Sequence, residues 1–327
     1  MLFHKLSLNI ASNRPFDRIF KEWAMTENQQ ATQSSPLVGA IDAGGTTFKC
    51  AVLTPDRGIV ASRRIPTTSP EQTFDQCRAF FNENTTNGIE IKSLGIACFG
   101  PLTLDRSSPD YGMIHNTPKP GWSGANAKHY FERALAIPVH IETDVNAALL
   151  AERQWGAAQN SETSVYITVG TGIGAGIYAN GGLLGGKHHP EFGHIAVERH
   201  PMDKDFNGRC SFHGSCLEGL ASAPALTDRF GNPEKLGPDH AGWAITADYL
   251  AQACLSLIYT LRPERILLGG GLMQAPHIIP QIRNRIIDRL NNYAGISSIE
   301  IEKMITPPAL GENAGLMGGG ILALRSD

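Results

Sequence analysis

The first segment able to do chemistry is a glycine-rich turn, Asp42-Ala-Gly-Gly-Thr-Thr-Phe-Lys49, between two apolar stretches. Its two glycines have no side chain, so backbone N–H groups can approach a phosphate closely, and the two threonines add hydroxyl donors. The aspartate can hold Mg²⁺ through water, since that ion keeps several waters. A glycine hairpin with an incidental aspartate is the structural alternative. The residues predicted to bind phosphate and its metal ion are Asp42, Gly44, Gly45, Thr46, Thr47 and Lys49.

A second glycine-rich turn is Gly170-Thr-Gly-Ile-Gly-Ala-Gly176. It contains the G-x-G-x-G pattern of dinucleotide-binding proteins, but there the pattern opens a helix and an acidic residue follows about 20 residues later. Here the turn runs into another apolar stretch and then Gly181-Gly182, which favours a hairpin. A second turn of this kind favours the phosphate-binding interpretation of the first over an incidental hairpin. The residues of this turn predicted to contact phosphate are Gly170, Thr171, Gly172 and Gly174.

A third glycine-rich segment, Leu267-Leu-Gly-Gly-Gly-Leu272, follows a predicted strand and precedes a predicted helix. A surface without side chains suits packing against a flat nucleoside. Glycine at a strand end also serves close backbone packing alone, which is the structural alternative. The residues predicted to contact a nucleotide here are Gly269, Gly270 and Gly271.

Two cysteines and two histidines are spaced like the ligands of a zinc ion: His194, Cys210, His213 and Cys216. Four nitrogen and sulfur donors are what tetrahedral Zn²⁺ takes, and binding the ion would order the polar loop at 200–215. Partial matches to zinc spacing arise by chance, so unligated cysteines and surface histidines are the alternative. Three further histidines are rival ligands: His188, His189 and His200.

Asp144 is the candidate catalytic base. It follows a strand predicted at 139–142, at the junction of the two halves of the chain, where a carboxylate could face a cleft. It could instead cap a helix predicted to begin near Asn146, and the local sequence does not decide between these roles. A carboxylate with a pKa of ~3.9 is a weak base. Phosphoryl transfer tolerates this, because orienting the attacking hydroxyl matters more than removing its proton early.

The elements that position these residues form two copies of one α/β unit. Strands predicted at 37–42, 48–53 and 59–62, a helix near 71–84 and a strand at 93–98 give the βββαβ order of a ribonuclease-H-like unit. From residue 164 the order strand, glycine turn, strand returns, an internal echo of residues 38–53. We therefore expect an α/β fold with two related lobes and a central cleft.

The two lobes are predicted to be unequal. Residues 37–138 form a small N-terminal lobe that a C-terminal helix within 313–327 closes, and residues 139–312 form a large lobe with the zinc loop. Helices are expected near 125–135, 146–155, 245–260 and 275–293, with strands at 139–142, 164–169, 175–178 and 265–268.

In order and spacing, the three turns resemble the phosphate-1, phosphate-2 and adenosine segments of the sugar kinase, actin and Hsp70 superfamily. Four segments resemble the ROK family in particular: Asp42–Thr46, Glu142–Ala148, Thr168–Gly176 and Glu191–His194. The segments at 111–122 and 210–222 resemble the bacterial fructokinase branch of that family. The resemblance covers residues 37–327.

The resemblance implies an ATP-dependent kinase that phosphorylates the 6-hydroxyl of a free hexose, with Mg²⁺ bridging the phosphates and Asp144 as base. The fructokinase segments indicate fructose as substrate and fructose 6-phosphate as product. Mannokinase and glucokinase of the same family are the near alternatives. A sugar-responsive repressor would need a DNA-binding helix-turn-helix, which the segment before Leu37 does not show. A sugar-binding protein without activity is disfavoured by the intact Asp144.

The resemblance also implies the residues that contact the sugar: Thr143, Asp144, Glu191, His194 and Glu218. His194 would bind zinc through one ring nitrogen and face a sugar hydroxyl with the other. Many ROK kinases have asparagine where this chain has Thr143. The shorter side chain bears on which hexose is preferred.

Charge and composition limit the partners. The chain has 28 basic and 31 acidic residues, so no strong basic field favours a nucleic acid or an anionic membrane. The longest apolar runs fall short of the ~18 residues of a spanning helix. Six cysteines without a framework of close spacings indicate a reducing cytoplasm. Sugar and ATP are therefore the expected partners, and a homodimer is compatible with the sequence.

Residues 1–36 do not share the pattern of the rest. The segment is polar and rich in Gln, Ser and Thr toward its end, a composition that buries too little apolar surface to fold. We predict a disordered extension, or an upstream start with the true start at Met25.

Overall fold

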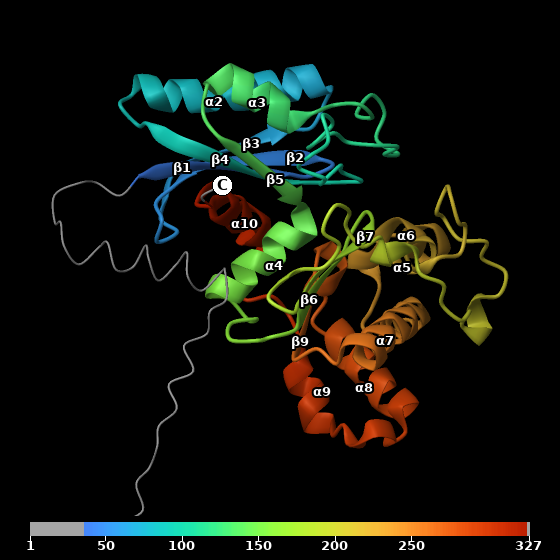
Figure 1. Ribbon diagram of the computed structural model, residues 1–327. Coiled ribbons are helices and arrows are strands. Elements are labelled where there is room, and N and C mark those ends of the chain that lie inside the picture. The colour runs from blue at the N-terminus through green and yellow to red at the C-terminus, as the bar shows by residue number, and fades with distance from the viewer. Residues whose placement is uncertain (1–35, 326–327) are drawn as a thin grey trace, which may run out of the picture.

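Two five-stranded mixed sheets form the framework of the protein, one above the other in Figure 1. The computed structural model describes residues 36–325. The extension predicted for residues 1–36 thus lies outside the described residues, except for Pro36. Each sheet has helices on its outer face, and two further helices lie between the sheets (Figure 1).

The first sheet has the strand order β3-β2-β1-β4-β5. Its strands are β1 (Leu37–Ala43), β2 (Thr47–Leu53), β3 (Ile59–Pro66), β4 (Ile91–Cys98) and β5 (Val139–Thr143). β2 runs antiparallel to β1 and β3, whereas β1, β4 and β5 are parallel. Helices α2 (Pro70–Thr86) and α3 (Ala127–Leu135) cover the outer face. The predicted βββαβ order is confirmed.

The second sheet repeats this topology with the order β10-β9-β6-β7-β8. Its strands are β6 (Ser164–Val169), β7 (Ile173–Ala179), β8 (Gly182–Leu183), β9 (Arg265–Gly269) and β10 (Ile305–Thr306). β7 is antiparallel to β6 and β8, and β6, β9 and β10 are parallel, so each strand has a counterpart in the first sheet. The internal repeat is confirmed. The second glycine-rich turn joins antiparallel β6 and β7, as the hairpin interpretation requires.

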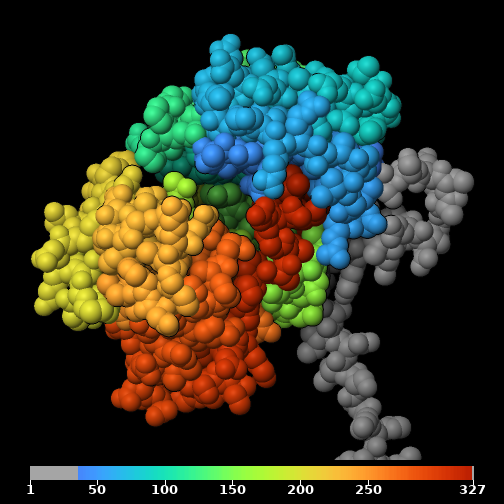
Figure 2. All heavy atoms as spheres, turned by 180° about the vertical axis from the view of Figure 1, so that it is seen from behind, coloured from blue at the N-terminus to red at the C-terminus, as the bar shows by residue number. Residues whose placement is uncertain are grey.

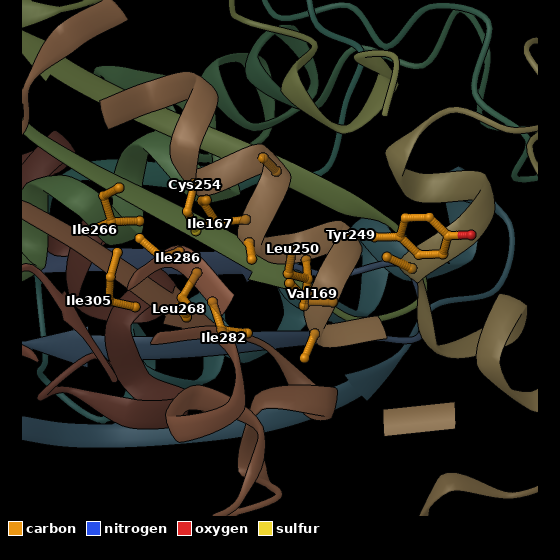
Figure 3. Close-up of a cluster of buried hydrophobic side chains, with 14 of the residues drawn as sticks. Ile167, Val169, Tyr249, Leu250, Cys254, Ile266, Leu268, Ile282, Ile286 and Ile305 are labelled. Atoms are coloured by element: carbon orange, nitrogen blue, oxygen red, sulfur yellow. The ribbon is translucent and has the colours of Figure 1, made fainter. Parts of the chain in front are cut away.

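The core of the second lobe lies between this sheet and its outer helices. Those are α5 (Leu217–Ala221), α6 (Ala223–Phe230), α7 (Ala241–Leu261), α8 (Ile278–Leu290) and α9 (Ser298–Met304). Strand residues alternate between two faces, so Ile167 and Val169 join this core while Tyr166 points to the helices between the sheets. Figure 3 shows apolar side chains of β6 and β9 meeting those of α7 and α8.

α7 is long and apolar enough, by length and composition, to cross a membrane, which the sequence analysis overlooked. Most of it is buried inside the second lobe, where Leu250 and Cys254 pack against the sheet (Figure 3). Its apolar character is therefore explained by its place in the core.

Helices α4 (Asp144–Trp155) and α10 (Ala314–Ala323) lie between the two sheets (Figure 1). α10 packs so closely on β4 that a Cβ at Gly95 would lie 1.9 Å from the backbone oxygen of Gly319. Only glycine fits at this crossing. The helix that was predicted to close the small lobe is thus part of the contact between lobes, with residues 326–327 outside the described range.

Two of the predicted boundaries differ from the structure in ways that bear on the lobes. β5 pairs with β4, so the first lobe extends to residue 143 rather than 138, because its fifth strand follows the long connection after α3. The helix predicted at 275–293 begins at Ile278, because a short 3₁₀ helix at Gly271–Gln274 precedes it.

Candidate active site

The first glycine-rich turn joins β1 to β2 and is held by hydrogen bonds on its closed side. The Gly44 amide donates to the Thr47 carbonyl oxygen at 3.1 Å, and the Thr67 hydroxyl donates to the Gly44 carbonyl oxygen at 2.8 Å. Gly45 and Thr46 are exposed on its other side. The turn is therefore fixed in shape and open to a ligand.

Asp42 and Lys49 lie opposite each other on β1 and β2 at the base of this turn. The Lys49 Nζ is 3.4 Å from Asp42 Oδ2 and donates to the Glu312 carbonyl oxygen at 2.7 Å. Burial raises the pKa of Asp42, and the charge of Lys49 opposes that rise. The pair places one carboxylate and one ammonium group beside the start of α10.

Asp144 is the first residue of α4, directly after β5. Thr143, not Asp144, caps this helix: its Oγ1 accepts the Asn146 amide at 3.2 Å. The helix therefore begins two residues earlier than predicted, and the capping alternative for Asp144 is removed. Burial raises the pKa of Asp144 to about 7, and the negative charge of Asp42 adds to the rise.

The second glycine-rich turn is braced by a carboxylate from the second lobe. Glu218, in the first turn of α5, accepts the Ile173 amide through Oε2 at 2.9 Å. The Gly170 amide donates to the Gly172 carbonyl oxygen at 2.9 Å, which closes the turn. Gly170 also accepts the Ala223 amide at 2.9 Å, so the turn is tied to the start of α6.

Two pockets meet at Asp144. A cavity of about 620 Å³, here called the Glu191 pocket, opens between the lobes, and a cavity of about 260 Å³, the Asp42 pocket, lies beside α10. Asp144, Val145 and Thr168 line both. Figure 2 shows the molecule hollowed at its waist, between the blue first lobe and the yellow and orange second lobe.

Most residues predicted for the site line these pockets. Those in the Glu191 pocket are Gly45, Thr46, Thr143, Asp144, Gly170, Thr171, Gly172, Gly174, Glu191, His194, Cys210 and Glu218. Those in the Asp42 pocket are Asp42, Lys49, Asp144, Gly270 and Gly271. Residues that line neither pocket are Gly44, Thr47, Gly269, His213 and Cys216.

The third glycine-rich turn divides into packing and lining positions. A Cβ at Gly269 would lie 2.4 Å from the Tyr166 hydroxyl oxygen. Gly270 has a φ of +92°, and a Cβ there would lie 2.5 Å from the Val169 carbonyl oxygen. Gly271 has open space beside it and lines the Asp42 pocket. Gly269 therefore fits the close-packing interpretation of this turn, and Gly271 fits the interpretation as an open surface.

The four predicted metal ligands come together. Their donor atoms all lie within 4.8 Å of one another. His194 Nδ1 is 3.5 Å from Cys216 Sγ and 3.7 Å from Cys210 Sγ, which is 3.6 Å from His213 Nδ1. A tetrahedral zinc ion with its usual bond lengths would place nitrogen and sulfur ligands about 3.6 Å apart, so the donor set fits that ion.

The rival histidines point elsewhere. His189 Nε2 accepts the Leu102 amide at 3.0 Å, and its Nδ1 is 3.4 Å from Glu191 Oε1. His200 Nδ1 accepts the Met202 amide at 3.2 Å. Neither these two nor His188 belongs to the cluster. The other ring nitrogen of His194, Nε2, is 4.0 Å from Glu191 Oε2, so this histidine links the cluster to the pocket.

Several lining residues were not predicted from the sequence: Phe99, Gly100, Pro101, Asn116, Thr117, Pro118, Lys119 and His189. Four of them lie in the segment at 111–122, which was noted only for its resemblance to fructokinases. A lysine flanked by two prolines in that segment was the available signal, because prolines fix the backbone that carries the side chain.

The duplicated ribonuclease-H-like sheet, with glycine-rich turns of both lobes at one cleft, defines the class of two-lobed proteins that share the actin, Hsp70 and sugar kinase fold. Within this class the chain belongs to the ROK family, whose sequence profile matches residues 38–326.

Relatives with assigned names align with most of this chain. A fructokinase of Zymomonas mobilis is 42% identical over 295 residues, which make up 89% of this chain and 97% of the relative. A fructokinase of Pediococcus pentosaceus is 39% identical and covers 88% of this chain and 97% of its own. Among solved structures, a ROK hexokinase from Thermus thermophilus has a TM-score of 0.71 at 26% identity, covering 88% of this chain and 97% of its own.

Proposed function

We propose that this protein is a fructokinase that transfers the γ-phosphoryl group of ATP to the 6-hydroxyl of fructose. The observation that carries the proposal is the position of Asp144, which lines both the Glu191 pocket and the Asp42 pocket. A hydroxyl bound in the first pocket and a phosphoryl group entering from the second would meet at this carboxylate. The relatives named fructokinases support fructose as the acceptor.

Each pocket has the chemistry that its proposed ligand needs. Glu191, His194 and Glu218 give the larger pocket hydrogen-bonding groups for sugar hydroxyls. The first and second glycine-rich turns line the Glu191 pocket together with Asp144, and their backbone N–H groups would suit the β- and γ-phosphates where these reach Asp144 from the Asp42 pocket. Gly271, with open space beside it, is proposed to pack against the nucleoside.

In the transfer, Asp144 orients the 6-hydroxyl and accepts its proton as the oxygen bonds to phosphorus. A pKa of about 7 suits a base that works near neutral pH. Closure of the two lobes would bring the hexose against the phosphate and exclude water.

Two metal ions have fitting residues. Asp42 would hold Mg²⁺ through water, and the ion would neutralise charge on the phosphates. The cluster of His194, Cys210, His213 and Cys216 would hold Zn²⁺ as a structural ion. By fixing His194, the cluster would set the direction of the Nε2 atom toward the sugar.

A panel of hexoses assayed with ATP and Mg²⁺ tests the proposal. We expect the highest kcat/KM with fructose, activity with mannose, and rejection of N-acetylated hexosamines, and fructose 6-phosphate should be the product. Discrimination among epimers should be modest, because water can replace a moved hydroxyl, whereas a missing hydroxyl costs up to about 10⁴-fold. A clearly higher kcat/KM with glucose would assign the protein to the glucokinases, and no transfer to any hexose would contradict a kinase.

A further inference from the structure

We propose that Lys119 is a catalytic residue of this cleft that contacts the transferred phosphoryl group. The inference rests on the proposed kinase function and adds to it a cation that no sequence motif assigned. Lys119 is half-buried and lines the Glu191 pocket together with Asp144. Its Nζ donates a hydrogen bond to the carbonyl oxygen of Gly45, in the first glycine-rich turn. The ammonium group thus lies at the phosphate turn, in the same pocket as the proposed base.

The backbone at Lys119 is unusually constrained for a loop. Pro118 and Pro120 flank it. The ring of Pro118 fixes the φ angle of that residue, and Pro120 restricts the preceding Lys119 to extended conformations. The Lys119 amide donates to Thr117 Oγ1 at 3.3 Å, and its carbonyl oxygen accepts the Trp122 amide at 3.3 Å.

Trp122 anchors this loop in the core of the first lobe. Its side chain is fully buried, and its Nε1 donates to the Thr68 carbonyl oxygen at 2.8 Å. Its ring packs against Phe48, Phe74 and Phe99, with centroids 5.2–5.5 Å away. A buried aromatic residue three positions away therefore fixes where the lysine side chain begins.

The charges of the pocket favour such a cation. Among the described residues that line the Glu191 pocket, Lys119 is the one lysine or arginine, against the carboxylates of Asp144, Glu191 and Glu218. In the Asp42 pocket, Lys49 is already engaged by Asp42 and by the Glu312 carbonyl oxygen. A phosphoryl group that approaches Asp144 would meet repulsion from these carboxylates, which Lys119 would offset in addition to the proposed Mg²⁺.

The chemical step gives the lysine its role. The 6-oxygen of the hexose forms a bond to the γ-phosphorus of MgATP while the bond from that phosphorus to the bridging oxygen breaks, leaving ADP. The hydroxyl proton passes to Asp144. Negative charge spreads over the three equatorial oxygens during transfer, and a cation aimed at them stabilises this state. We place the Lys119 ammonium at one of these oxygens, where it gives up its bond to Gly45.

The test compares Lys119→Met, Lys119→Arg and the control Lys92→Met in the full-length protein. Lys92 is exposed and lies at the opposite end of β4 from the cleft. We expect Lys119→Met to lower kcat on the order of 10²-fold, as loss of a charge-stabilising donor does. Fructose KM should stay within about threefold, Lys119→Arg should recover part of kcat, and Lys92→Met should match the wild type.

A second measurement separates catalysis from structure. MgADP with aluminium fluoride and fructose mimics the planar phosphoryl group, and its affinity should fall in Lys119→Met while affinity for the non-hydrolysable analogue AMPPNP stays unchanged. Wild-type kcat in Lys119→Met, a loss confined to fructose KM, or an equal loss of both affinities would each overturn the inference. An inactive wild type would overturn the proposed function as well, whereas an active wild type with an equally active Lys119→Met would overturn this inference alone.

Discussion

Replacing Asp144 with asparagine should stabilise the folded protein at neutral and alkaline pH while it removes the proposed base. The pKa of the Asp144 carboxyl is raised from 3.8 to about 7, chiefly by burial and further by Asp42. The folded protein therefore holds a proton that the unfolded chain loses between about pH 4 and pH 7. Stability falls as the pH rises through this window, and the asparagine variant does not share that loss.

The size of the effect follows from the shift. One pKa unit corresponds to about 1.4 kcal/mol, so ionised Asp144 costs on the order of 2–4 kcal/mol in free energy of unfolding above pH 7. The advantage of Asp144→Asn over the wild type should grow by about 2–3 kcal/mol between pH 5 and pH 8. The amide keeps the oxygen that accepts the Val145 amide at 2.9 Å, so the start of α4 should be preserved.

Urea unfolding at pH 5 and pH 8, without nucleotide or Mg²⁺, measures this difference. Asp288→Asn is the matched control, because that carboxylate is exposed on α8, far along the chain from the cleft. The control should show no comparable pH-dependent gain. If the free energies of unfolding of Asp144→Asn and the wild type differ by the same amount at both pH values, or by less at pH 8, the argument that ionising Asp144 costs stability is refuted.

Two further predictions concern the metal cluster and the lobe contact. Cys216→Ser should remove bound zinc, measured by elemental analysis, and weaken fructose binding by about tenfold or more while ATP affinity stays unchanged. The reason is that His194 links the cluster to the Glu191 pocket. Unchanged fructose affinity in zinc-free protein would contradict this link. Gly95→Ala should lower the free energy of unfolding by about 2 kcal/mol or more, because the new Cβ would lie 1.9 Å from the backbone of α10. Gly45 has open space beside it, so Gly45→Ala should change the free energy of unfolding by less than about 0.5 kcal/mol. Equal stabilities of the two variants would be evidence against the close packing of α10.

Much of the fold followed from local pattern. Strands with strong apolar runs, such as those on either side of the first and second glycine-rich turns, were predicted nearly to the residue, and their repeated order predicted the shared topology of the sheets. The lobe boundary was misplaced because membership of β5 in the first sheet depends on pairing with β4, about 45 residues earlier in the chain, which local pattern does not report.

The site was predictable where side-chain type carries the chemistry. The cluster of two cysteines and two histidines was predicted from spacing, and the rival histidines were excluded only by their positions in the structure. Lys119 was missed because nothing in its own residue type separates a cleft lysine from a solvated one. The role of Thr143 as helix cap was likewise missed, since an adjacent aspartate offers the same local signal. The sugar contacts, the cytoplasmic location and a homodimer stay predictions.

The most direct test of a phosphoryl-transfer cleft centred on Asp144 is the turnover of Asp144→Asn with fructose, MgATP and a parallel measurement of fructose affinity. The amide keeps the shape of the side chain but cannot accept the hydroxyl proton. We expect kcat to fall on the order of 10²-fold or more while the dissociation constant for fructose stays within a few-fold of the wild-type value. Near-normal kcat in the variant would contradict the assignment of Asp144 as the base between the two pockets.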